Sequence, residues 1–259
     1  MVGLDVRPVA RPALAPGIGG LPPGVLDGHR AGIRPDAITM ATMPVISQAG
    51  QPDIVRDWFE TPAGRAILDS EHALVAGALG SHPGLPWLWV APRTPTAQVE
   101  GRGLRLTRCG SLLEGPMRCA APLPLPSEAF GAVVLQHVVG GRADTLGLLD
   151  EATRVLAPGG HLWLLVLNPL TPYRWRWRGT GIASAEPLTW RRRMRDAGLA
   201  PDAVSNGVGP SWRVAPVSDV QNGPGLRAAY ALRGQKRHLP LTPVRSRRVM
   251  PMPAAAPAA

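Results

Sequence analysis

Several residue types are scarce in this sequence, and each scarcity excludes a class of protein. Cys109 and Cys119 are the only cysteines and form no C-x-x-C pair, so neither a disulfide framework nor a zinc site is indicated. No apolar run approaches the ~20 residues that span a bilayer, which excludes an integral membrane protein with helical spans. We therefore expect a cytoplasmic protein without a metal centre.

Lysine is almost absent. Lys236 is the only lysine among 28 Lys and Arg residues, and the formal net charge is +10. This charge favours a nucleic-acid or anionic-membrane partner. The preference for arginine, together with 30 Gly and 30 Pro, is equally typical of a compositional bias of the coding sequence. Both interpretations stay open.

The two ends of the chain lack the apolar periodicity of folded sequence. Residues 1–42 are rich in Pro, Gly and Arg and contain no apolar core of about 7 to 15 residues that would indicate a signal peptide. We expect this segment to be disordered, or to precede a misassigned start codon, since Met40 and Met43 stand where patterned sequence begins. Residues 236–259 form a basic, Pro/Ala-rich tail that we also expect to be disordered. The predicted domain is therefore 43–235.

The segment from Leu123 to Pro169 has the pattern of strand, helix and strand. Gly131 to Leu135 is a valine-rich apolar run typical of a buried parallel strand. A helix capped by Asp144 should follow and end at Pro158-Gly159-Gly160, before a second strand from Leu162 to Leu167. The apolar stripe of this helix comprises Leu146, Leu149, Ala152, Thr153 and Leu156. Two such strands joined by a helix make a right-handed crossover, which predicts a doubly wound α/β domain.

Further elements are predicted on both sides of this unit. Thr61 and Pro62 begin a helix that ends near Gly80. Trp87–Val90 and Leu104–Leu106 are candidate first and second strands. A basic helix should run over Leu188–Ala197, followed by a sixth strand up to Val208. Leu226–Arg233 has the short alternation of a terminal antiparallel strand.

One motif set resembles a known family. The pattern L-P-x-P-x-x-x-F-x-x-V-x-x-x-x-V is followed by E-A-x-R-V-L, then by P-G-G and a strand ending in N-P. The matching residues are Leu123, Pro124, Phe130, Val133, Val138, Glu151, Ala152, Arg154, Val155, Leu156, Pro158, Gly159, Gly160, Asn168 and Pro169. This pattern resembles the methyltransferase type 11 group of class I S-adenosylmethionine-dependent enzymes. The resemblance implies a mostly parallel seven-stranded sheet of the Rossmann-like methyltransferase fold, S-adenosylmethionine as cofactor, and a small-molecule acceptor.

The resemblance also assigns candidate site residues by position. The cofactor would lie against the end of the first strand, the loop just before Leu123, and the end of the fourth strand. The carboxyl ends of strands are where open α/β sheets bind ligands. The corresponding residues are Val90, Ala91, Pro92, Cys119, Ala120, Ala121, Gln136 and His137. His137 is a candidate general base, with a structural hydrogen bond as its alternative role, and Asn168 could touch an acceptor.

Three features of the family's cofactor site are missing. The family has a glycine-rich turn after the first strand, where the backbone approaches the cofactor, but no glycine occurs between Trp87 and Glu100. The family's acidic residue at the end of the second strand is absent near Leu104 to Arg108, and so is the acid before the L-P pair. These departures predict weak or no binding of S-adenosylmethionine. The alternative function is a non-catalytic member of the fold that binds a partner protein, RNA or anionic membrane.

The segment from Tyr173 to Arg178 alternates Arg with aromatic residues. Three interpretations compete: contact with an anionic membrane or lipid-like substrate, stacking on nucleic-acid bases, and packing of Trp on the domain with Arg in solvent. The basic tail could add contacts with polyanions. Nearer the N-terminus, Trp58, Phe59 and His72 could form a lid over the cofactor site or pack in the core.

Overall fold

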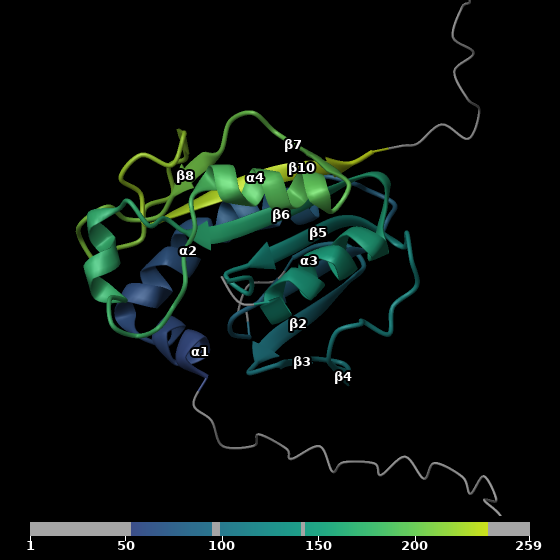
Figure 1. Ribbon diagram of the computed structural model, residues 1–259, viewed down its shortest axis with the longest axis horizontal. Helices are drawn as coiled ribbons and strands as arrows, with labels where there is room; N and C mark the ends of the chain where they lie inside the picture. Colours follow the sequence, from purple (N-terminus) through teal and green to yellow (C-terminus); the bar gives the residue numbers. More distant parts are fainter. Residues whose placement is uncertain (1–52, 95–98, 141–142, 238–259) are drawn as a thin grey trace, which may run out of the picture. The chain divides into compact units, whose positions relative to one another are not determined.

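The computed structural model describes residues 53–94, 99–140 and 143–237, and for 143–146 the backbone alone (Figure 1). These residues belong to the unit Gln48–Ala259. The predicted N-terminal segment 1–42 lies outside the described residues, and so do residues 238–259 of the predicted tail 236–259, whose first residue, Lys236, instead ends a strand. No described helix is long and apolar enough to cross a membrane.

A single sheet carries the fold, with strand order β4-β3-β2-β1-β5-β6-β10-β8-β9 and β7 paired with β10. The strands are β1 Trp87–Ala91, β2 Gly103–Cys109, β3 Leu112–Glu114, β4 Arg118–Cys119, β5 Phe130–Gln136, β6 Leu156–Leu167, β7 Leu199–Pro201, β8 Asn206–Val208, β9 Gln221–Asn222 and β10 Ala229–Lys236. The helices are α1 Ile54–Phe59, α2 Pro62–Leu79, α3 Ala143–Val155, the 3-10 helix η1 Pro172–Arg176, and α4 Pro187–Asp196.

The predicted fold class is confirmed. Strands β2, β1, β5 and β6 are parallel neighbours, and β10 is antiparallel to β6, as expected for the last strand. In the described part of the chain the sheet has ten strands, where seven were expected. Three very short strands account for the difference: β3 and β4 extend the sheet beyond β2, and β9 extends it beyond β8. Each of these strands has only two or three residues, which is too short for an apolar pattern that would predict a strand from the sequence.

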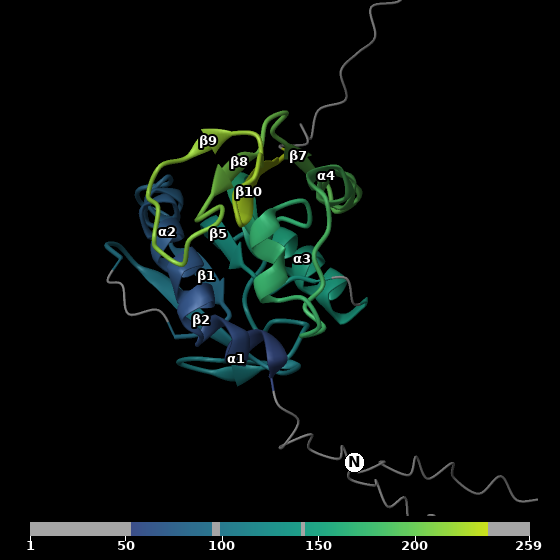
Figure 2. The same ribbon diagram turned by 90° about the vertical axis from the view of Figure 1, so that its left-hand side faces the viewer.

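Helices cover both faces of the sheet (Figure 2), where α2 lies on one side and α3 and α4 lie on the other. Apolar side chains of α3 and α4 pack with one set of strand residues, including Val133, Leu135 and Leu164. Those of α2 pack with the opposite set, including Trp89 and Val134. Because successive strand side chains point to opposite faces, the continuous apolar strands β1 and β5 can be buried from both sides.

The connection from β1 to β2 departs from the usual crossover. A parallel crossover usually contains a helix, but the described residues of this connection, 92–94 and 99–102, are not helical. The indoles of Trp87 and Trp89 are still buried on this face, with the Arg105 guanidinium 5.6 Å and 5.8 Å from their ring centroids. Gly103 makes room for Trp87, because an added Cβ there would lie 2.0 Å from the indole.

Two details of the central crossover differ from prediction. Helix α3 begins at Ala143, so Asp144 lies inside its first turn instead of capping it. The segment Pro158-Gly159-Gly160 does not separate helix from strand, because β6 already begins at Leu156. The extra residues bulge out of the ladder: Phe130 pairs with Leu156 and Ala132 pairs with His161. Gly159 has φ +79°, which suits glycine in such a bulge.

Candidate functional site

Two cavities open near the carboxyl ends of the central strands. The larger has a volume of about 350 Å³ and lies between α2 and the end of β1, with His72, Trp89, Pro92 and Gln136 in its wall. The smaller, about 40 Å³, is lined by residues from α1, β2 and β6, from the segment after β5, and from the loop that contains Ile182 and Ala183. In open α/β sheets this end of the strands is where ligands bind.

A buried polar network separates the two cavities. Glu71 on α2 has no solvent exposure. Its Oε2 accepts a hydrogen bond from Gln136 Nε2 at 2.7 Å, and its Oε1 lies 2.9 Å from His137 Nε2. Trp89 Nε1 donates to Gln136 Oε1 at 3.1 Å. Gln136 and Trp89 reach the larger cavity and His137 reaches the smaller one, so one carboxylate organises the polar groups of both.

The contacts of His137 define its tautomer. Because a carboxylate can only accept, Nε2 must carry a proton, and in the neutral ring Nδ1 is then a bare acceptor. This Nδ1 is buried and has no hydrogen-bond partner among the described residues. His137 also has φ +52°, a left-handed conformation that is costly for a non-glycine residue, and its ring stacks on Phe59 at 4.7 Å. The structure thus holds a buried ring nitrogen without a hydrogen-bond partner among the described residues, on a residue that lines the smaller cavity.

The turn after β1 has no cofactor-binding loop of the usual form. Val90 is buried in the core on the α3 side. Ala91 and Pro92 are also buried and line the larger cavity. Arg93, next in the chain, donates to Glu60 at 3.1 Å. Proline has no amide hydrogen, so Pro92 offers a ligand no backbone donor.

At the end of β2 a cation occupies the region where the resemblance implies an acid. Arg108 lines the smaller cavity and donates from Nη1 to the Val138 carbonyl at 2.5 Å. Its Nε donates to the Gly110 carbonyl at 3.0 Å. A guanidinium has five donor hydrogens and no acceptor, so it cannot accept hydrogen bonds from ribose hydroxyls. Arg108 therefore favours anionic or carbonyl groups in this cavity.

The remaining positional candidates lie apart from this network. Cys119 is on β4 at the edge of the sheet, with β3 and β2 between it and β1, and Ala120 and Ala121 are exposed. Partial burial raises the pKa of the Cys119 thiol. Asn168 is fully buried: its Nδ2 donates to the carbonyls of Gly225 and Arg227, and its Oδ1 accepts from Leu170 N. These bonds give Asn168 a structural role in fixing the chain after β6.

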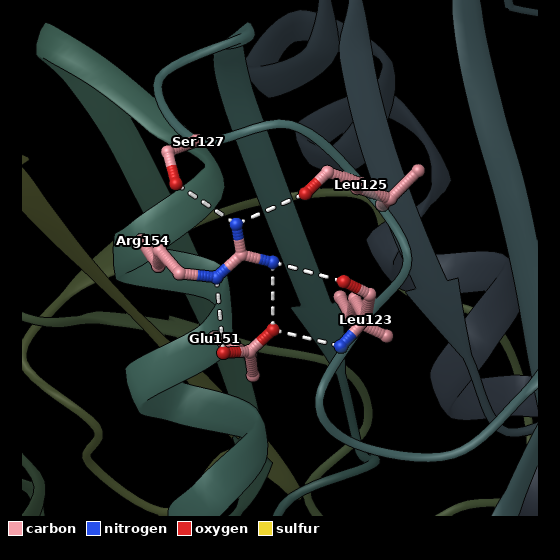
Figure 3. A network of polar contacts seen from close by, with 5 residues as sticks. All are labelled: Leu123, Leu125, Ser127, Glu151 and Arg154. Carbon is pink, nitrogen blue, oxygen red and sulfur yellow. Dashed lines mark hydrogen bonds and ion pairs between the residues drawn. The ribbon is translucent and has the colours of Figure 1, made fainter.

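The family motif itself forms a structural clamp (Figure 3). Glu151 Oε2 accepts from the backbone of Leu123 at 2.7 Å, and Arg154 donates to the carbonyls of Leu123 and Leu125 and to Ser127 Oγ. Two further bonds join Arg154 to Glu151, at 3.0 Å and 2.8 Å. These bonds hold the pKa of Glu151 below its ordinary value. The motif residues thus fasten the loop before β5 to α3, with no ligand required.

The three proposed lid residues separate. Phe59 lines the smaller cavity and His72 lines the larger one. Trp58 packs edge-on against Trp177 in the core, with ring centroids 5.6 Å apart, and its Nε1 donates to the Arg176 carbonyl. Helix α1 is attached to the sheet through Asp53, whose Oδ2 accepts from Gly110 N at 2.7 Å.

Glu71 and Arg108 were not predicted as site residues. Glu71 lies four residues after Ile67 and four before Val75, so it falls on the apolar stripe of its helix. An acid within such a stripe is a signal for a buried partner. Arg108 gives no comparable signal, because arginine is abundant throughout this sequence. No group of three His, Cys, Asp or Glu suited to hold a metal ion occurs in the part of the chain that the structure describes.

An open, mostly parallel sheet with helices on both faces and cavities at the carboxyl ends of its central strands defines a Rossmann-like α/β protein. Within that class, residues 103–164 match the family model described as a methyltransferase domain. This stretch is thus similar to a methyltransferase domain, in agreement with the resemblance to the type 11 group. The match covers about a quarter of the sequence and begins at β2, after the turn that lacks glycine.

Solved structures of methyltransferases are similar to the chain. One is an S-adenosylmethionine-dependent methyltransferase from Thermotoga maritima, described as a possible histamine N-methyltransferase, with 17% identity, 71% of this chain and 99% of that chain covered, and a TM-score of 0.49. Another is the putative methyltransferase in complex with the Trm112 activator of Haloferax volcanii, with 16% identity, 71% and 98% covered, and a TM-score of 0.46. No curated protein matches the sequence.

S-adenosylmethionine, which the family implies, does not fit this site in the family's manner. Ligand pockets for molecules of this size have volumes of about 300 to 1,000 Å³, so the smaller cavity is too small and only the larger one is adequate. The wall of the larger cavity includes Ala91, Pro92, Arg93 and Thr94, where the family has its glycine-rich turn. Among the described residues that line this cavity, Asp69, His72 and Arg93 are the charged or titratable ones.

Proposed function

We propose that the protein is a class I methyltransferase-like protein that binds a small molecule at the carboxyl ends of β1 and β5, with weakened or lost methyl transfer. The observation that carries this proposal is the buried Glu71, Gln136 and His137 network between two cavities. Burying a carboxylate is costly unless it is paired, and strained backbone at His137 is typical of functional sites. A domain that only packed its core would gain nothing from either feature.

The chemistry that this network retains is proton exchange at His137. Its Nε2 is held by Glu71, which orients the ring and would stabilise a positive charge on it. Its Nδ1 is buried and has no hydrogen-bond partner among the described residues, so it could exchange a proton with a ligand hydroxyl or amine only if the wall of the smaller cavity opened.

Weakened cofactor binding is supported by the same wall residues. A hydrogen bond to a charged group contributes about 1.5–3 kcal/mol, so the loss of two acidic anchors would weaken binding hundreds-fold or more. Pro92 removes a backbone donor in addition. We therefore expect S-adenosylmethionine to bind far more weakly than in enzymes that keep these anchors.

Calorimetric titration of the full chain with S-adenosylmethionine, S-adenosylhomocysteine, adenosine and methionine tests this proposal. We expect at most millimolar affinity for the two intact cofactors. A His137→Phe variant, which fills the same space without an acceptor, separates ligand binding at the network from binding elsewhere. Micromolar affinity of the unaltered protein for S-adenosylmethionine would overturn the proposal and assign an active methyltransferase.

A further inference from the structure

Large apolar side chains are exposed on three neighbouring loops. Trp175 is 70% exposed, Trp212 67%, Leu170 64%, Leu226 54% and Val214 39%. Leu170 and Trp175 follow β6, Trp212 and Val214 follow β8, and Leu226 precedes β10. We call these five residues the apolar patch. Single exposed apolar residues are normal, whereas a cluster of them marks an interaction site.

Hydrogen bonds hold these loops side by side. Arg176 Nη2 donates to the Trp212 carbonyl at 3.1 Å, and Thr171 Oγ1 donates to the Leu226 carbonyl at 2.6 Å. Asn168 adds bonds to Gly225 and Arg227. In Figure 1 the segment after β6 and the chain between β8 and β10 accordingly gather at the left-hand end of the domain. The patch is therefore a joint surface of loops that are distant in sequence.

The short helix η1 presents its part of the patch rigidly. Tyr173 and Trp177 are buried, and the Tyr173 hydroxyl donates to the Ala63 carbonyl at 3.1 Å. Thr171 caps the helix by accepting from Tyr173 N. Trp175 lies between these two anchors in sequence and remains exposed, with the Arg178 guanidinium 4.7 Å from its ring centroid. The interpretation of this segment as core packing thus holds for Tyr173 and Trp177 and fails for Trp175.

Positive charge surrounds the patch. Arg174, Arg176, Arg178 and Arg213 are exposed, and none forms an ion pair with a carboxylate among the described residues. The sequence has no acidic residue from 170 to 185 or from 209 to 218. The nearest acid in the second loop, Asp219, is paired with Arg227 at 2.6 Å. The patch therefore carries a net positive field that no described carboxylate offsets.

We propose that the apolar patch and its four arginines bind the surface of an anionic membrane. Indole and aliphatic side chains gain by entering the interfacial region, and each arginine is attracted to acidic headgroups by about 1 kcal/mol. Single-stranded nucleic acid would use the arginines and the indoles, because bases stack on aromatic rings. It gives no comparable role to Leu170, Val214 and Leu226. The aliphatic part of the patch therefore favours the membrane.

Co-sedimentation of the full chain with vesicles tests this inference. The vesicles contain 70% phosphatidylcholine and 30% phosphatidylserine, and pure phosphatidylcholine vesicles serve as the neutral comparison. We expect binding to the anionic vesicles only, weakening steeply with salt. The double variant Arg174→Gln, Arg178→Gln should weaken it about 25-fold, at about fivefold per arginine. Trp175→Ser with Trp212→Ser should reduce it by at least about fivefold.

The matched control is Arg192→Gln with Arg195→Gln, which removes two exposed arginines from α4 and leaves the patch intact. We expect the factor by which this control weakens vesicle binding to be less than half of the factor for the patch variants. Equal loss in control and patch variants, or no loss in either, would assign vesicle binding to net charge or to the basic tail and overturn the proposal. The proposal would also be overturned if the protein did not bind vesicles. It would be overturned as well if the protein bound a single-stranded RNA oligonucleotide more tightly than vesicles and the double tryptophan variant kept that RNA binding.

Discussion

At the scale of single residues, Glu71 positions the polar side chains near the cavities. Its carboxylate is fully buried and contacts both Gln136 and His137, and Gln136 in turn contacts Trp89. A buried acid without partners would be strongly destabilising, and its partners without the acid would be buried donors left unsatisfied. The network is therefore stable only as a whole.

Removing Glu71 should consequently destabilise the protein more than removing a surface acid from the same helix. We expect Glu71→Ala to lower the free energy of unfolding by about 3–5 kcal/mol, because it strands Gln136 and His137. The measurement is urea denaturation followed by circular dichroism. Asp69→Ala is the control, since Asp69 is exposed on the same helix, and it should stay within about 0.5 kcal/mol of the unaltered protein. Equal losses in the two variants would contradict the network.

Gln136 and His137 were predictable from sequence, and their partner was not. Both follow a valine-rich strand, and the carboxyl ends of parallel strands are where α/β proteins place ligands. Glu71 is 65 residues before Gln136, and only tertiary packing of α2 against β5 brings them together. The loop Cys119 to Ala121 was assigned by position alone, and the antiparallel turn of β3 and β4 carries it to the sheet edge.

At the scale of elements, the Glu151 and Arg154 clamp fixes the loop before β5 to helix α3. In the folded protein Arg154 lowers the pKa of Glu151 from its ordinary value of 4.5. Glu151 therefore binds a proton less readily when folded than when unfolded. Its stabilisation is complete above the unfolded-state pKa and is lost as the pH falls through the lowered folded-state pKa.

Glu151→Ala should lower the free energy of unfolding by about 1.5–3 kcal/mol at neutral pH, because the clamp loses charged hydrogen bonds. The difference from the unaltered protein should shrink when urea denaturation is repeated at successively lower pH, as the pH falls through the lowered pKa of Glu151 and the carboxylate is protonated. Asp150→Ala removes the adjacent exposed acid as a control. A Glu151→Ala deficit that is unchanged at low pH would show that the clamp does not depend on the charge.

The 3-10 helix η1 allows a sharper comparison, since two tryptophans two residues apart have opposite environments. Trp177 is 5% exposed and contacts Trp58, whereas Trp175 is 70% exposed. We expect Trp177→Ala to lower the free energy of unfolding by about 3–5 kcal/mol through the cavity it creates. Trp175→Ala should change it by at most about 0.5 kcal/mol. Thermal and urea denaturation of both variants would reveal a reversed order if the assignment of core and surface were wrong.

Long periodic elements were predicted well and short irregular ones were not. Helix α2 begins after Thr61, whose hydroxyl accepts from Gly64 N, and it ends before Gly80 as expected. The cap, the proline and the apolar spacing are all local signals, so the sequence alone reveals them. The strands β3, β4 and β9 depend on neighbours to pair with. Their two or three residues carry no periodicity of their own.

At the scale of the whole molecule, the match to the family model covers β2 to β6, whereas β1 and the turn after it lie outside the match. The family match begins at β2 and ends within β6, and its motif residues serve the clamp and the sheet. The turn after β1 lies outside the match and lacks glycine. Packing and the clamp thus account for the matched residues without a ligand.

Restoring the missing anchors should therefore raise cofactor affinity. Thr107 pairs with Ala91 at the carboxyl end of β1. An acid in place of Thr107 would therefore lie beside the turn that begins at Pro92. We expect the double variant Pro92→Gly, Thr107→Asp to bind S-adenosylmethionine at least about tenfold more tightly than the unaltered protein, since one charged hydrogen bond contributes about 1.5–3 kcal/mol. Isothermal titration calorimetry with both S-adenosylmethionine and S-adenosylhomocysteine measures the change.

The matched control is Pro92→Gly, Thr107→Asn, which keeps the shape of the new side chain and removes its charge. If the carboxylate accepts from the ribose hydroxyls, only the aspartate variant gains affinity, and the gain fades as the carboxylate is protonated at low pH. Equal gains in the two variants would attribute the weak binding to the stiff turn at Pro92 alone. No gain in either would contradict the prediction and show that these two positions do not limit the affinity for S-adenosylmethionine.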